Sequence, residues 1–278
     1  MKISIFSLFR DSENYIHKCL STLDKIRDNS NFEFEYFFYE NDSKDKTKFI
    51  LEDWIQDKNG KIKSETLNAK KFGSTLHPER MILISEVRNK MLKLGKDSNS
   101  DYSVIFDSDV NFDFNIINKF LKHKDLDFSM LTPNIRQDVP CKMGSNSKTS
   151  YYDSSILFDS KGMHTMTWSD NPFYEESDRD LFKNLKPIQV TRAFGGFVFL
   201  KTKTLLKVKW NSKGESEHFS FCDALRAYGK IYLIPEIQPS VSITQKNWDH
   251  ENLVIEKQTK LLENSWNRFL LKNNSFSL

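Results

Sequence analysis

The chain has 278 residues, of which 38% are hydrophobic and 13% aromatic. That apolar content supports a large buried core and excludes an intrinsically disordered chain. The length suits one large domain or two halves that share a sheet. The 41 Lys and Arg residues are nearly matched by 38 Asp and Glu residues, giving a formal net charge of +3. This balance excludes a general polyanion-binding protein and predicts no nucleic-acid partner.

The cysteines and the apolar runs bear on where the protein resides. Cys19, Cys141 and Cys222 are widely spaced and odd in number, so they form neither a metal-ligand pattern nor a disulfide framework. The apolar run Ile3–Phe9 is far shorter than the roughly 20 residues of a spanning helix, and no later run approaches that length. We therefore expect a soluble, cytoplasmic protein with no transmembrane segment.

Strand-like and helix-like stretches alternate in the first part of the chain. Strands are predicted at Ile3–Phe9, Phe34–Tyr39, Ser64–Asn68 and Tyr102–Phe106. Helices are predicted at Asn14–Ile26, Lys48–Gln56 and Glu79–Leu94. Such alternation indicates an α/β fold with a mostly parallel sheet, whose ligands bind at the carboxyl ends of the strands. The polar loops after Phe9, Tyr39 and Phe106 are therefore expected to meet at one edge.

The second half is less regular. Further helices are predicted at Asn115–Leu121, Glu217–Gly229 and, near the C-terminus, Asp249–Leu271. Further strands are predicted at Asp127–Leu131, within Ile188–Leu200 and at Ile231–Pro235, and a polar loop at Lys142–Ser150.

The triplet Asp107-Ser108-Asp109 is the strongest candidate for chemistry. Side chains alternate along an extended segment, so both carboxylates can leave the strand end on one side. Two hard oxygen ligands suit Mn²⁺ or Mg²⁺, with substrate phosphates completing the shell. Asp125-Leu-Asp127 and Asp178-Arg-Asp180 share the pattern, but only the first triplet follows an apolar strand. We interpret the other two as surface charge.

Two further groups of polar residues lie near the predicted sheet edge. Glu40 and Asp42 follow the second strand and suit ribose or base contacts, although a turn or helix N-cap explains them equally well. On the helix before the metal strand, Arg80 and Arg88 lie about 80° apart, and Asn89 follows the second of them. Arginine favours bidentate phosphate contacts, and the alternative is a solvated charged face.

Glycines and a possible base occur later in the chain. Gly195-Gly196, between two phenylalanines, allows either close approach of an acceptor to a donor or a structural bend. A carboxylate in such a place can act as a general base and accept the proton of a substrate hydroxyl. Glu217 is the candidate, with His218 as the alternative base or as a metal ligand. A glutamate in a first helical turn can also simply complement the helix dipole.

Together these motifs resemble GT-A glycosyltransferases, and within them the group of fungal capsule-type mannosyltransferases and glycosyltransferases of large DNA viruses. The likeness runs from residue 3 to about residue 240 in family order. Its motifs are Ile5–Asn14, Glu40–Ser43, Arg80 with Arg88-Asn89, Phe106–Asp109, Tyr151–Asp153, Phe194–Phe197 and Glu217–Cys222, followed by Gly229 and Pro235. Many inverting members carry Glu-Asp where this chain has Glu217-His218, which leaves the base and the stereochemical outcome open.

The resemblance implies a UDP- or GDP-sugar donor, a glycan or glycoprotein acceptor, and Mn²⁺ or Mg²⁺ bound by Asp107 and Asp109. It implies donor contacts from Phe9, Arg10, Glu40, Asp42, Arg80, Arg88, Asn89, Asp107 and Ser108. It implies a sugar or acceptor pocket shaped by Tyr151, Asp153, Gly195 and Gly196. The chain is accordingly divided into a nucleotide-sugar-binding half (1–113), an acceptor-binding and catalytic half of the same domain (114–240) and a C-terminal helical extension (241–278).

Two other functions fit the same fold. One is a non-catalytic module that binds a nucleotide sugar or a glycan. The other is a metal-dependent sugar nucleotidyltransferase. Such enzymes open with a glycine-rich loop after the first strand, and Phe9–Asn14 contains no glycine.

Overall fold

The computed structural model describes residues 1–70, 72, 77–138, 149–166 and 169–241. Contacts divide the chain into two units, and the first is Met1–Lys71 with Leu76–Ser242. The second unit, Phe72–Thr75 with Ile243–Leu278, has Phe72 as its single described residue. The predicted helix at Asp249–Leu271 thus lies outside the described residues. The boundary between residues 113 and 114 stays a prediction.

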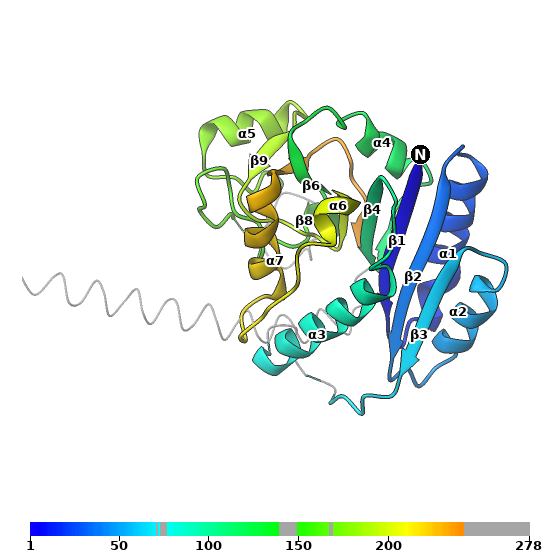
Figure 1. The fold of residues 1–278 in the computed structure, drawn as a ribbon. Helices are drawn as coiled ribbons and strands as arrows, with labels where there is room; N and C mark the ends of the chain where they lie inside the picture. Colours follow the sequence, from blue (N-terminus) through cyan, green and yellow to red (C-terminus); the bar gives the residue numbers. More distant parts are fainter. Residues whose placement is uncertain (71, 73–76, 139–148, 167–168, 242–278) are drawn as a thin grey trace, which may run out of the picture. The chain divides into compact units, whose positions relative to one another are not determined.

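A large mixed sheet forms the centre of the first unit (Figure 1). In the described part of the chain it has the strand order β3-β2-β1-β4-β10-β6-β11-β9. The strands are β1 Lys2–Phe9, β2 Glu33–Asn41, β3 Gly60–Glu65, β4 Tyr102–Asp107, β6 Phe128–Pro133, β9 Ile188–Val190, β10 Phe197–Lys201 and β11 Lys230–Ile234. Strands β3, β2, β1 and β4 are parallel, as are β6 and β11, whereas β10 and β9 run antiparallel to their neighbours. The mostly parallel α/β sheet predicted from the sequence is confirmed.

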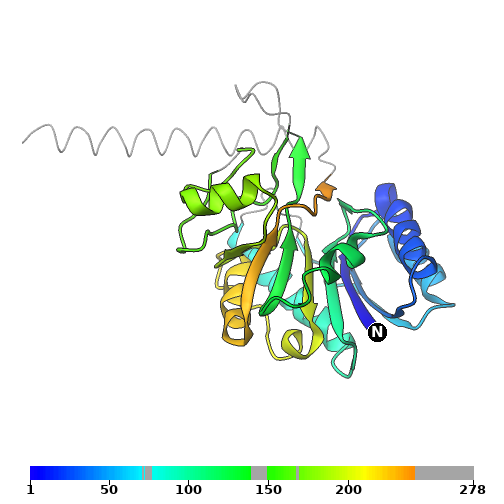
Figure 2. The ribbon, with the colours of Figure 1, turned by 90° about the horizontal axis from the view of Figure 1, so that it is seen from above.

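Helices cover both faces of this sheet (Figures 1 and 2). The helices are α1 Glu13–Asp28, α2 Thr47–Ile55, α3 Pro78–Leu94, α4 Ile116–Leu121, α5 Glu176–Lys183, α6 Thr202–Leu205 and α7 Glu217–Leu225, followed by the 3₁₀ turn η2 Arg226–Tyr228. None of the helices in these described segments combines the length and apolar content that crossing a bilayer requires.

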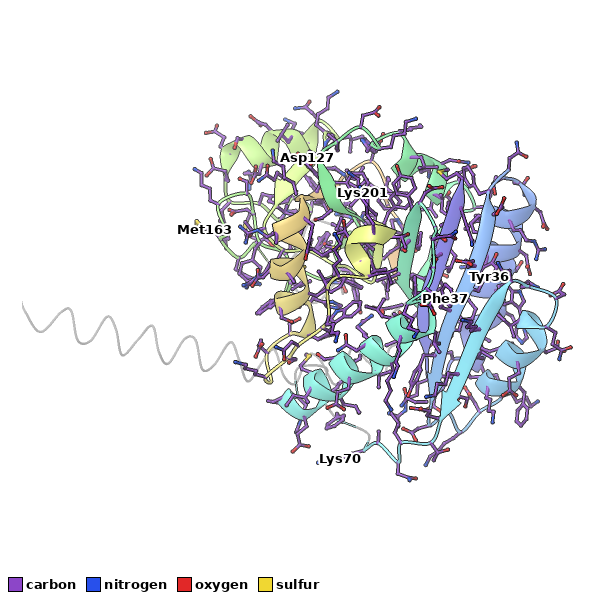
Figure 3. The ribbon with its side chains drawn as sticks, viewed as in Figure 1. Tyr36, Phe37, Lys70, Asp127, Met163 and Lys201 are labelled. Atoms are coloured by element: carbon purple, nitrogen blue, oxygen red, sulfur yellow. The ribbon has the colours of Figure 1, made fainter. Side chains whose placement is uncertain are left out.

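Strand β2 shows why both faces need cover. Its neighbours Tyr36 and Phe37, labelled in Figure 3, are both buried although their side chains point to opposite faces. The ring of Tyr36 packs on Trp54 of α2 with centroids 5.0 Å apart, and that of Phe37 stacks on Phe6 at 5.0 Å. A β-carbon on Gly95, at the end of α3, would lie 2.8 Å from Phe37. An almost continuous apolar strand is typical of a sheet covered on both sides.

Helix α3 forms as the sequence predicts. Pro78 stands at its first turn, where a missing N–H costs nothing, and the His77 side chain accepts a hydrogen bond from the Glu79 N–H. Gly95 caps the other end and donates its N–H to the Leu92 carbonyl. The helix thereby carries Arg88 across the sheet toward the end of β4.

A second, smaller sheet was not expected from the sequence. Among the described residues it has the order β5-β12-β7-β8. Its strands are β5 Val110–Asn111, β7 Arg136–Asp138, β8 Thr149–Tyr151 and β12 Ser240–Val241. Strands of two or three residues are too short for an alternating pattern to emerge. The predicted loop at Lys142–Ser150 is wrong at Thr149 and Ser150, which belong to β8, and its other residues lie outside the described part.

Two other expectations are corrected. The third strand was expected at Ser64–Asn68 but ends at Glu65, because the backbone N–H groups of Leu67 and Asn68 bond to the Asp42 carboxylate instead of a neighbouring strand. Asp178, interpreted as surface charge, is buried and accepts hydrogen bonds from the Ser160 N–H and hydroxyl. It fixes a loop to the start of α5.

Gly229→Ala is expected to lower the free energy of unfolding by about 2–3 kcal/mol. Gly229 has φ +149°, and a β-carbon there would lie 2.8 Å from the Ser129 nitrogen and 2.9 Å from the Phe128 carbonyl carbon, both backbone atoms of β6. Gly162→Ala is the matched control, since Gly162 has φ +82° but its β-carbon would meet only Thr191, at 3.9 Å. Urea denaturation should show a larger loss of unfolding free energy for Gly229→Ala than for Gly162→Ala. Equal denaturation midpoints for the two variants would contradict the predicted clash.

Candidate active site

The polar loops that follow β1, β2 and β4 meet at one edge of the sheet, as the sequence predicts. The Ser12 N–H donates to the Thr47 hydroxyl at 2.7 Å, and the Asp11 N–H donates to the Ser43 hydroxyl at 3.0 Å. The hydroxyls of Ser12 and Ser108 lie 3.3 Å apart. The carboxyl ends of three parallel strands thus form one continuous polar surface, the usual ligand edge of such sheets.

The residues expected to contact the nucleotide include several that shape this edge. Glu40 is 2% exposed, and its carboxylate accepts hydrogen bonds from the Ser43 N–H and the Ser64 hydroxyl. Arg10 donates to the Ala69 carbonyl at 3.2 Å. The side chain of Phe9 lies in the core against Phe38. The described contacts are those of a turn, and contact of these residues with a nucleotide stays a prediction.

The Asp42 carboxylate holds the loop of residues 67–69 that follows β3. Burial raises its pKa, but hydrogen bonds from Asn41 and from the backbone N–H groups of Ala69, Asn68 and Leu67 outweigh that effect and lower the pKa. The carboxylate therefore stays charged and holds this loop beside the strand ends.

Asp107 and Asp109 lie at the end of β4 and in the turn that follows it. The Asp107 N–H donates to the Gly196 carbonyl at 2.8 Å, and Gly196 has φ +74°. A β-carbon on Gly196 would lie 3.3 Å from Asp107 Oδ2, so glycine leaves room beside this oxygen. Burial, together with the negative charge of Asp107, raises the pKa of Asp109 to about 6.

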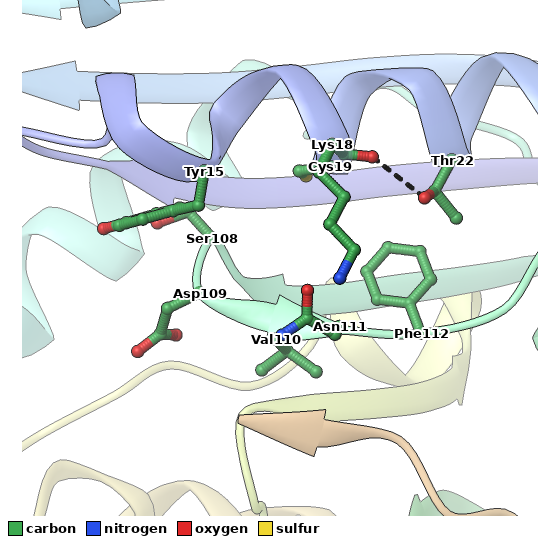
Figure 4. A pocket seen from close by; sticks show the side chains of 9 residues that line it. All are labelled: Tyr15, Lys18, Cys19, Thr22, Ser108, Asp109, Val110, Asn111 and Phe112. Atoms are coloured by element: carbon green, nitrogen blue, oxygen red, sulfur yellow. Dashed lines mark hydrogen bonds between the residues drawn. The ribbon is translucent and has the colours of Figure 1, made fainter. Parts of the chain in front are cut away.

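A small hollow opens between α1 and this turn. It is lined by Tyr15, Lys18, Cys19, Thr22, Ser108, Asp109, Val110, Asn111 and Phe112. Figure 4 shows Tyr15 and Lys18 on the helix, facing the segment that carries Ser108 and Asp109. The turn is thus bounded by α1 on one side and by the glycine pair on the other.

Arg88 connects Asp107, at the end of β4, with Glu217, at the start of α7. It is 3% exposed, and its Nη2 donates to Asp107 Oδ1 at 3.1 Å, whereas its Nε faces Glu217 Oε1 at 3.5 Å. Burial lowers the pKa of Arg88, but the charges of Asp107 and Glu217 outweigh it and raise the pKa. Nη1 has no hydrogen-bond partner among the described residues. A solvated charged face is therefore excluded for Arg88.

Glu217 and His218 open helix α7 and are both buried. His218 Nε2 lies 3.3 Å from Glu217 Oε1, and its Nδ1 accepts a hydrogen bond from Trp210 Nε1 at 3.4 Å. Burial, aided by the positive charge of Arg88, lowers the pKa of His218 well below its usual value, so the ring is neutral at pH 7. The Nδ1 of His218 is thus engaged by the Trp210 indole and its Nε2 lies beside Glu217, and a role as base or metal ligand stays a prediction.

The residues expected to shape the acceptor pocket lie around the glycine pair. The Asp153 carboxylate accepts hydrogen bonds from the Gly195 backbone and, at 2.8 Å, from the Ser155 hydroxyl. Burial, together with the charges of Glu217 and Asp107, raises the pKa of Asp153 to about 6. A β-carbon on Gly195 would lie 3.2 Å from the Tyr151 hydroxyl. Acidic groups from three parts of the chain thus surround one turn.

A family model described as Cryptococcal mannosyltransferase 1 matches residues 17–226, which is well over half of the chain. The chain belongs to the Cryptococcal mannosyltransferase 1 family. This membership confirms the resemblance noted in the sequence. A comparison with curated proteins found no match.

The fold of this mannosyltransferase-family chain is similar to that of S. aureus TarS residues 1–349, with a TM-score of 0.51 and 17% identity. The match covers 87% of this chain and 60% of that one. The complex of the same protein with UDP-GlcNAc gives a TM-score of 0.51 and 17% identity, covering 88% and 59%. The chain thus spans about 60% of the length of the TarS structures, and the likeness confirms the GT-A fold.

Two residues of this family member gain roles that the sequence did not reveal. Trp210 is 2% exposed, and its indole N–H donates to His218. The Asn89 side chain bonds to both the N–H and the carbonyl of Trp210, at 3.0 and 2.8 Å, and its contact with a donor stays a prediction. A buried tryptophan usually needs an acceptor for its N–H, which is the only signal the sequence offers.

Proposed function

We propose that this chain transfers a sugar from a UDP- or GDP-sugar to a hydroxyl of a glycan, with the help of Mn²⁺ or Mg²⁺. The observation that carries the proposal is the buried Arg88, which joins Asp107 at the end of β4 to Glu217 at the start of α7. A buried charge between two carboxylates at the ligand edge of a sheet is costly unless it serves the site. The UDP-GlcNAc complex of TarS supports a nucleotide sugar as the donor.

The donor atoms at this edge fit a divalent ion held by Asp107 and Asp109. Both offer carboxylate oxygens, the ligands that Mg²⁺ and Mn²⁺ prefer. Burial and, after it, repulsion from Asp107 raise the pKa of Asp109, and a cation would relieve the repulsion. Gly196 leaves space beside Asp107. Within the described ranges no three His, Cys, Asp or Glu side chains converge on a metal, so diphosphate oxygens and water would complete the shell. Such an ion supplies charge neutralisation for a departing diphosphate.

In the proposed step the acceptor oxygen bonds to the anomeric carbon, and the bond from that carbon to the β-phosphate oxygen breaks. The electron pair leaves with the nucleoside diphosphate, whose negative charge the guanidinium of Arg88 would help to balance. If the reaction inverts, the acceptor's proton passes to Glu217. Its Oε1 faces Arg88 and His218, and its Oε2 takes part in neither contact.

The test combines binding with turnover. UDP- and GDP-sugars are screened with Mn²⁺ for a rise in melting temperature, and donors that bind are assayed for nucleotide release with glycan acceptors. We expect one donor to stabilise the protein in a chelator-sensitive way, because a ligand that binds only the folded state raises stability. The same donor should release its nucleotide when an acceptor is added. Stabilisation without release would favour a non-catalytic binding module, and no stabilisation by any donor would contradict the proposal.

A further inference from the structure

Trp210 lies between α6 and α7 and is held rigidly. Its ring stacks on Phe221 with centroids 3.9 Å apart and an interplanar angle of 3°. Its backbone N–H and carbonyl both bond to the Asn89 side chain on α3. The indole N–H is therefore fixed in position relative to the helix that carries Arg88.

The indole N–H determines the state of His218. Because Nδ1 accepts the hydrogen bond from Trp210, the single proton of the neutral imidazole must reside on Nε2. The face of the ring stacks on Phe194 at 3.8 Å, which fixes the ring plane. Nε2, which carries that proton, lies 3.3 Å from Glu217 Oε1.

The same oxygen of Glu217 faces Arg88 Nε, and Arg88 in turn donates to Asp107. The Arg88 guanidinium also lies over the rings of Phe194 and Trp210, at 5.1 and 5.7 Å. A chain of close polar contacts thus runs from the indole through the imidazole and two charged groups to the strand end. We propose that Trp210 and His218 are positioning residues, which orient Glu217 and Arg88 for transfer without themselves touching the donor or the acceptor.

This inference rests on the proposed function, and it assigns His218 neither a proton-accepting nor a metal-binding role. The imidazole accepts from the indole at Nδ1, and its Nε2 lies beside a carboxylate oxygen. It thereby supports Glu217 Oε1, whereas Oε2 takes part in neither the His218 contact nor the Arg88 contact.

Trp210→Phe tests the first contact, because phenylalanine keeps an aromatic ring to stack on Phe221 but lacks the N–H. We expect kcat to fall about tenfold, the effect of one lost hydrogen bond. The donor KM should stay within about twofold, since orientation rather than binding is altered. The matched control is Trp54→Phe, which removes an indole hydrogen bond to Asp24 of 2.9 Å between α1 and α2. Trp54→Phe should leave kcat unchanged, and it should lower the melting temperature about as much as Trp210→Phe does.

His218→Phe and His218→Gln separate orientation from packing. Phenylalanine keeps a ring for Phe194 but offers Glu217 no N–H, so kcat should fall about 100-fold, as when two coupled hydrogen bonds are lost. Glutamine retains an N–H donor of similar reach and should recover most of that loss. Equal kcat values for His218→Gln and His218→Phe, or a wild-type kcat for Trp210→Phe, would overturn the inference.

A measurement without turnover keeps the test independent of substrate. In protein labelled with ¹⁵N-histidine, the His218 ring should show protonated Nε2 and unprotonated Nδ1 at pH 7, and Trp210→Phe should shift the Nδ1 resonance. A charged ring or the opposite tautomer in the wild-type protein would contradict the positioning chain, whether or not a donor is found. Failure of every donor in the screen, with this ring pattern intact, would instead count against the proposed function.

Discussion

Asp109→Asn is expected to reduce sugar transfer about 10³-fold at saturating Mn²⁺. A bound divalent ion contributes several kcal/mol to transition-state stabilisation, and each ~1.4 kcal/mol corresponds to a factor of ten. The variant should fold as well as the wild type when metal is absent, because asparagine has the same shape and removes a negative charge beside Asp107. Activity should therefore fall while stability does not. The kcat measures the activity, and thermal unfolding in the presence of chelator measures the stability.

The control for this prediction is Asp127→Asn. Asp127 belongs to a second Asp-x-Asp triplet but lies exposed on the surface, where Figure 3 labels it. Its replacement should leave transfer at the wild-type rate. If Asp109→Asn retained full activity, the metal assignment would be wrong. If both variants lost activity alike, charge rather than metal ligation would be the cause.

Arg88→Met is expected to lower the free energy of unfolding by about 3–5 kcal/mol and to abolish transfer. Methionine fills much of the same volume but leaves the buried Glu217 without its cationic partner, and breaking a buried ion pair from one side carries a cost of this size. Arg226→Met is the matched control. Arg226 is half exposed and lies 3.9 Å from Asp223, so its loss should change stability by less than about 1 kcal/mol.

A double variant sharpens the second prediction. Adding Glu217→Gln to Arg88→Met removes the uncompensated carboxylate, so much of the lost stability should return while transfer stays absent. Chemical denaturation of the four proteins in the cycle, paired with nucleotide release, measures the coupling between the two side chains. A single variant with a wild-type denaturation midpoint would show that the pair is not buried as the structure has it.

Much of the ligand edge could be predicted from the sequence, because its physical signals are local. A long apolar run such as Ile3–Phe9 predicts a buried strand. Parallel strands then bring the loops that follow them to the same edge of the sheet. The apolar stretch before Asp107 distinguished its triplet from the one at Asp178. The prediction that Asp178 is a surface charge was nevertheless wrong. Its burial depends on contact with Ser160, which lies in a loop that no local sequence pattern places beside it.

The partnerships that tie the site together could not be predicted. Arg88 and Glu217 are separated by 129 positions, and only the packing of α3 against α7 brings them into contact. In sequence, Arg88 reads equally well as one more charge on a helix face. Likewise, a carboxylate at Asp42 looks the same whether it meets a ribose or three backbone N–H groups, and the end of β3 depends on which it meets.

The placement of β10 has a consequence for the two halves of the chain. This strand, from the second half, inserts antiparallel beside β4, the last long strand of the first half, and pairs along Phe197–Lys201. In a fragment that ends at residue 113, the backbone N–H and C=O groups on that side of β4 would be unpaired. They could then pair with a strand of another chain. Asp107, at the end of β4, and Asp109 thus lack a finished scaffold until ribosomal synthesis has passed residue 201, so residues 1–113 cannot complete their sheet before the second half is made.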